Sequence, residues 1–127
     1  MKRVATSISG LLMLFLLSPG FARAQNKTFT GEIMDSSCAK DGSHAMMLKK
    51  EGMGNMDPND VKAKKMCTDN CVQKMGAKYV LYTPSKAVYQ LDDQTKPSQF
   101  AGQKVKITGT LDAASKAIRV TDIQPAS

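Results

Sequence analysis

Three cysteines and one histidine are the residues in this chain best suited to carry chemistry. They are Cys38, His44, Cys67 and Cys71. Three thiolates and an imidazole form a recognised four-coordinate zinc set. Thiolates are also good ligands for Cu(I), and seven of the nine methionines lie between residues 34 and 75, so copper is the rival metal. The residue types therefore predict a metal site made of these four side chains.

Cys67 and Cys71 are four residues apart in a segment that predicts a helix. Side chains at this spacing share one helix face, so both sulfurs point toward a common partner rather than toward each other. That partner is either a metal ion or Cys38, which would then form a disulfide with one of the two. A single disulfide would leave one of the three thiols free. Both alternatives remain open from the spacing.

Residues 1–24 predict a secretory signal peptide. A basic start precedes a mostly apolar stretch over 4–17, and the small residues Ala22 and Ala24 stand before a cut at Gln25. We expect a periplasmic or secreted protein with no membrane contact after cleavage. Loss of this segment removes three basic residues and lowers the formal net charge from +7 to +4. With that ordinary charge and no Trp, we expect a protein or envelope partner and no nucleic acid.

The mature chain, 25–127, predicts one small domain that is mainly β with one helix. Five segments alternate with the period of a strand: 28–34, 78–82, 87–91, 103–111 and 117–123. Five short antiparallel strands close readily into a small barrel, so we expect a five-stranded antiparallel OB-like barrel or sheet. The usual OB fold has its helix between strands three and four. Here the helix is expected between strands one and two.

The segment between the first two strands divides in two. Residues 35–57 are expected to be a loop insertion, with one or two helical turns at 44–51. A cap at Asp57 followed by Pro58 predicts a helix over 58–75, and the β-rich half then covers 76–123. We expect Val72 and Met75 to pack this helix on the sheet. Its cysteine edge would then face the loop.

The chain resembles a group of small exported bacterial proteins of uncharacterised function. In that group a D-S-x-C segment and a following histidine precede a helix with C-x3-C and a β-rich half. The matching segments here are Asp35-Ser36-Ser37-Cys38, His44, Cys67 with Cys71, and Gly76-Ala77-Lys78-Tyr79-Val80-Leu81. The resemblance implies an exported domain with a Cys/His cluster, and it brings no activity with it.

We expect no enzyme. The two helical cysteines lie well inside the predicted helix, away from the N-terminus where a dipole activates a thiol. The C-x-x-C motif of disulfide oxidoreductases is absent from the sequence. The function expected from the sequence is therefore an exported domain that binds zinc or Cu(I). The alternative is a disulfide-stapled, non-enzymatic binding or structural module of the cell envelope.

Overall fold

The structure is a computed structural model that describes residues 25–126. The predicted signal peptide lies outside the described residues. Five strands form one sheet: β1 (Lys27–Asp35), β2 (Tyr79–Tyr82), β3 (Val88–Leu91), β4 (Lys104–Asp112) and β5 (Ala117–Pro125). Their order is β1-β2-β3-β5-β4, and pairing of β4 with β1 closes the sheet into a barrel. The mainly β prediction is confirmed, and β2 and β3 form a hairpin.

The expectation of an all-antiparallel sheet is wrong at one pair. β3 and β5 run parallel, with Gln90 opposite Ala117 and Leu91 opposite Ile118. The other four strand pairs are antiparallel. Parallel neighbours cannot be joined by a tight turn and need a crossover connection. Here α4 and β4 supply that crossover, and alternation within single strands could not reveal it.

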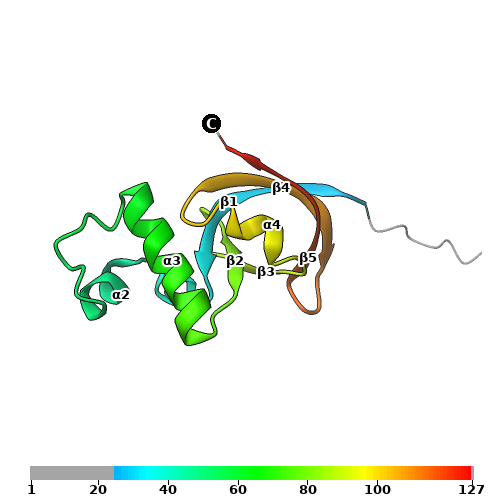
Figure 1. Cartoon of the computed structure of the whole chain (residues 1–127). Coiled ribbons are helices and arrows are strands. Elements are labelled where there is room, and N and C mark those ends of the chain that lie inside the picture. Colours follow the sequence, from blue (N-terminus) through cyan, green and yellow to red (C-terminus); the bar gives the residue numbers. More distant parts are fainter. Residues whose placement is uncertain (1–24, 127) are drawn as a thin grey trace, which may run out of the picture.

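The expectation of one helix is also wrong. The described residues form four: α1 (Cys38–Asp41), α2 (Ala45–Lys50), α3 (Val61–Met75) and α4 (Thr95–Ser98). Three of them lie between β1 and β2, so the segment expected to be a loop insertion contains α1 and α2, and α2 lies within the helical turns expected at 44–51. The short α4 lies between β3 and β4. Figure 1 shows α2 and α3 together beside the sheet, while α4 lies against the strands.

The long helix, α3, begins three residues later than predicted. Asp60 is its N-cap, and its side chain accepts hydrogen bonds from the backbone N–H groups of Lys62 and Ala63. The Asp57 carboxylate instead accepts from Asn59 N, which makes a local turn before the helix. The helix ends at Met75 as predicted, because Gly76 takes the left-handed C-cap conformation with φ 70°.

Two hydrophobic clusters form the interior. One fills the closed sheet, and its buried members include Ile33, Leu81, Ile107 and Ile118. The other lies between the sheet and the helices that follow β1, and it contains all three cysteines. Val72 packs against both clusters, as expected for the helix, whereas Met75 is 51 % exposed and the expectation that it packs was wrong. The cysteine-bearing half is thus a separate layer fastened to the sheet.

Candidate metal centre

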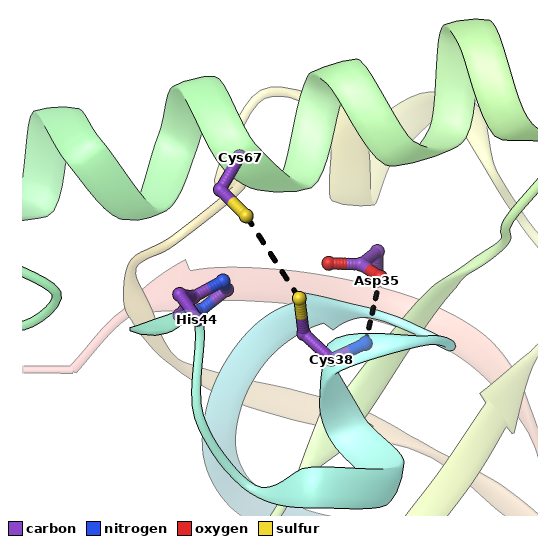
Figure 2. A group of neighbouring side chains, drawn as sticks. All are labelled: Asp35, Cys38, His44 and Cys67. Carbon is purple, nitrogen blue, oxygen red and sulfur yellow. Dashed lines mark hydrogen bonds between the residues drawn. The ribbon is translucent and has the colours of Figure 1, made fainter. Parts of the chain in front are cut away.

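Four buried side chains converge where the end of β1 meets α3. Asp35 is the last residue of β1, Cys38 begins α1, His44 immediately precedes α2, and Cys67 lies on α3. One potential ligand atom from each lies within 4.8 Å of all the others. Figure 2 shows the two sulfurs facing each other, with the His44 ring and the Asp35 carboxylate beside them. Four separate pieces of backbone therefore supply one compact group of donors.

Three of the four predicted site residues belong to this group. Cys38, His44 and Cys67 come together, although 29 residues separate the two cysteines in the chain. Cys71 is buried one helical turn further along α3 and is not part of the group. Asp35 is the fourth member, and the sequence analysis assigned it no role. The sequence did contain a pointer to Asp35, because this residue stands three positions before Cys38 in the D-S-x-C segment.

The two oxygens of Asp35 have different surroundings. Oδ1 accepts hydrogen bonds from the backbone N–H groups of Ser37, at 3.0 Å, and Cys38, at 2.9 Å. Oδ2 is buried and has no hydrogen-bond partner among the described residues. A buried carboxylate oxygen without a partner is costly, since burial removes its hydration. The arrangement holds the carboxylate in place through one oxygen and leaves the other available to a cation.

His44 shows the same division between its two ring nitrogens. Nε2 lies 3.2 Å from Glu32 Oε1, while Nδ1 is buried without a hydrogen-bond partner in the described part of the chain. Lys64 Nζ donates to the other oxygen of Glu32 at 2.7 Å. When the ring is neutral with its proton on Nε2, as metal binding requires, the imidazole donates to Glu32 and presents the lone pair of Nδ1. A carboxylate that orients a histidine in this way is typical of metal sites in proteins.

The sulfurs of Cys38 and Cys67 are 3.8 Å apart, and the three cysteines are free. This separation is far longer than the ~2.05 Å of a disulfide bond. The two groups share a proton: the hydrogen bond between them raises the pKa of Cys38 and lowers that of Cys67. Cys67 is therefore the thiolate of the pair and Cys38 the thiol.

Charged neighbours also control protonation around the pair. Burial alone would lower the pKa of His44, but the adjacent Cys67 and Glu32 raise it to about 9. Burial alone would raise the pKa of Glu32, yet His44 and Lys64 hold it below its usual value. Burial, with Asp35 and Cys67 nearby, raises the pKa of Cys71 to about 12. At neutral pH Cys71 is thus a neutral thiol beside a charged group.

The donor set suits a borderline or soft divalent cation. Two sulfurs, one imidazole nitrogen and one carboxylate oxygen are all donors that zinc accepts. All four belong to buried residues, so a metal held between them would be enclosed by protein. None of the helices within residues 25–126 has the length and apolar character needed to cross a membrane.

Comparison with known proteins adds one match. A family described as a protein of unknown function, DUF5818, matches residues 71–126. The matched region begins at Cys71 and covers the β-rich half of the chain. It leaves out Asp35, Cys38, His44 and Cys67, so the candidate centre lies outside it. No curated protein and no solved structure matches the chain.

Proposed function

We propose that this protein is an exported domain that binds one zinc ion through Asp35, Cys38, His44 and Cys67. The observation that carries the proposal is the pair of buried atoms without partners, Asp35 Oδ2 and His44 Nδ1, in the same group as the two sulfurs. Unpaired buried polar atoms are rare and need an explanation. A cation between them would satisfy both at once.

The sulfur separation supports the same proposal. Two sulfurs bound to one tetrahedral zinc at ~2.3 Å each stand about 3.8 Å apart. Cys38 Sγ and Cys67 Sγ are 3.8 Å apart. The pair therefore has the spacing of two ligands of one ion. The disulfide-stapled module, which was the alternative from the sequence, has less support because the described cysteines are free.

The role we assign to the metal is structural binding rather than catalysis. Structural zinc sites use four protein ligands, whereas catalytic sites keep one position for water or substrate. The centre offers four buried protein donors. It would fasten α3, through Cys67, to the segment that contains Cys38 and His44. We therefore propose a non-enzymatic domain with a metal-stabilised layer beside an OB-like barrel.

The export part of the proposal rests on residues 1–24. Their basic start, apolar stretch and small residues before Gln25 are those of a cleaved signal peptide. The proposed location is the periplasm or the exterior of the cell. An intact mass beginning at Gln25 in the exported fraction would support this, and a mass that retains residues 1–24 would contradict it.

A comparison of three variants tests the ligand set. Asp35→Asn keeps an oxygen for the Ser37 and Cys38 N–H groups but replaces the unpaired oxygen by an amide, so zinc affinity should fall at least ~100-fold. Cys67→Ser should abolish stoichiometric zinc. Cys71→Ala is the matched control, since it removes a buried thiol one turn away and should still hold one zinc per chain. Elemental analysis and a competing chelator measure these outcomes.

The control also distinguishes the two ligand sets. If Cys71→Ala loses zinc while Asp35→Asn retains it, the Cys3His set expected from the sequence is correct and the set proposed here is wrong. If the wild-type protein carries no metal and one disulfide, the metal function itself is wrong.

A further inference from the structure

The candidate centre is buried, so an ion needs a passage to reach it. Asp35 and Cys67 are fully buried, and Cys38 and His44 are each only 2 % exposed. A cavity of about 280 Å³ borders Cys38 from the surface side. Met46, Met47, Asp41 and Lys50 also line it. This cavity therefore connects solvent with one of the four proposed ligands.

Met46 is unusual among the methionines near this cavity. It is 71 % exposed, so packing does not explain its presence on α2. Met47, its neighbour on the same cavity, is half-buried and packs against the cysteine-containing cluster. Met53 and Met56 are also half-buried against that cluster, but they do not line the cavity. Two thioethers thus line the cavity through which an ion could reach Cys38.

A second cavity borders the centre from the His44 side, and it is smaller, with a volume of about 90 Å³. Its charged lining residues, Glu32 and Lys64, pair with each other, and Met34 also lines it. The cavity beside Cys38 is larger, and the charges of Asp41 and Lys50 at its wall oppose each other. The charges of this cavity therefore do not favour one cation over another. The soft sulfur donors of Met46 and Met47 decide which cations are favoured.

We propose that the cavity beside Cys38 is the entry port of the metal centre, and that Met46 and Met47 speed the entry of soft cations of the Cu(I) type, so that Cu(I) competes with zinc for this centre. This rests on the proposed function, because it assumes that the centre binds metal. Thioether sulfur binds Cu(I) well and zinc weakly. A soft ion would bind a methionine sulfur first and then transfer to the Cys38 sulfur, with loss of the thiol proton to water. No electron is transferred in this exchange.

The test compares uptake rates of two ions. Metal-free protein is mixed anaerobically with Cu(I) or with Zn²⁺, each buffered by a chelator, and the loading rate is followed. Met46→Leu with Met47→Leu preserves side-chain size and removes both thioethers. This double variant should load Cu(I) about tenfold more slowly, equivalent to ~1.4 kcal/mol of barrier. Its Zn²⁺ loading rate should be unchanged. The matched control, Met53→Leu with Met56→Leu, should load both ions at the wild-type rate.

A second variant tests the port itself. Lys50 is exposed at the cavity wall, so Lys50→Trp should narrow the opening without disturbing the fold and slow the loading of both ions. Equal Cu(I) rates in wild type and the Met46/Met47 variant would overturn the role of the two methionines, and unchanged rates in Lys50→Trp would overturn the port. In both cases a wild-type protein that still binds one zinc leaves the proposed function standing. Absence of stoichiometric metal at equilibrium would instead overturn both proposals.

Discussion

At the scale of single residues, the side chains of Asp35 and His44 are arranged in the same way. Each uses one polar atom to fix its orientation within the protein and keeps the other buried and unpaired. For Asp35 the fixing partners are backbone N–H groups, and for His44 the partner is Glu32. Glu32 is itself held by Lys64. Orientation is thus determined before any ion arrives, which reduces the ordering that metal binding requires.

The protonation states predict how metal affinity depends on pH. Cys38 carries the proton that it shares with Cys67, and the pKa of His44 is raised to about 9, so both are protonated at pH 7. A metal binds only the deprotonated groups, so binding at pH 7 should release about two protons, and affinity should rise with pH, less steeply above about 9, where Cys38 alone still loses a proton. Titration calorimetry in buffers of different ionisation enthalpy counts these protons.

The control for this pH dependence is again Cys71→Ala. Because Cys71 is outside the proposed ligand set, its removal should leave the proton release unchanged. A proton release near zero at pH 7, or an affinity that falls as pH rises from 7 to 9, would contradict the assigned protonation states.

At the scale of elements, the position of α3 decides whether the centre forms, since α3 supplies Cys67. Gly102, in the turn before β4, lies against this helix. A Cβ atom at Gly102 would lie 2.6 Å from Lys65 N and 2.7 Å from Lys64 Cβ. The Gly102 N–H also donates to Ile33 O at 2.8 Å, which fixes the turn to β1. Close packing between this turn and α3 therefore requires a residue without a side chain.

Two glycine variants separate backbone strain from displacement of the helix. Gly102 and Gly76 both have positive φ, 75° and 70°, but a Cβ at Gly76 meets nothing within 4 Å. Each change to Ala should cost about 1–2 kcal/mol of unfolding free energy through backbone strain. Only Gly102→Ala should also weaken zinc binding, because it pushes α3 and Cys67 away from Asp35. Denaturant unfolding and chelator competition measure the two effects, and equal zinc affinities in both variants would refute this account.

The elements also show what sequence patterns could and could not predict. The sequence pattern predicts the ends of every strand within one or two residues, because the alternation of apolar and polar residues follows the buried face of a strand directly. The parallel β3–β5 pair was missed because it joins strands far apart in sequence. Helices α1 and α2 were missed or only partly expected because such short helices depend on tertiary contacts more than on propensity.

The same limit applies to the candidate centre. Cysteine and histidine types pointed to Cys38, His44 and Cys67 directly. That Asp35 rather than Cys71 lies in this group depends on where β1 ends relative to α3, and no spacing rule contains that information. A carboxylate next to a turn has a simpler explanation as a turn residue, and Oδ1 of Asp35 does cap the turn at Ser37 and Cys38.

At the scale of the whole molecule, two cores of different character lie side by side. The closed sheet buries a large aliphatic cluster of its own. The helical layer buries the three cysteines and three alanines together with Met34, Leu48 and Val80, and it holds the two unpaired ligand atoms as well. A layer that buries mainly small side chains would gain stability from the proposed metal.

Removal of the metal should therefore affect the two layers differently. After chelation, backbone amides of residues 36–76 should exchange with solvent faster, while those of β4 and β5 should keep their protection. Hydrogen exchange read by mass spectrometry compares the two regions in one sample. The control is Cys71→Ala with zinc bound, which should keep protection in both. A uniform loss of protection across the sheet would contradict the separation of the layers.

The central claim is that one ion is bound by two sulfurs, one nitrogen and one carboxylate oxygen. X-ray absorption of the zinc-loaded protein tests it most directly, because the scattering shells count sulfur and lighter ligands separately. The account predicts two sulfurs at ~2.3 Å and two nitrogen or oxygen neighbours at ~2.0–2.2 Å. A shell of three sulfurs and one nitrogen would contradict it, because Cys71 would then have taken the place of Asp35.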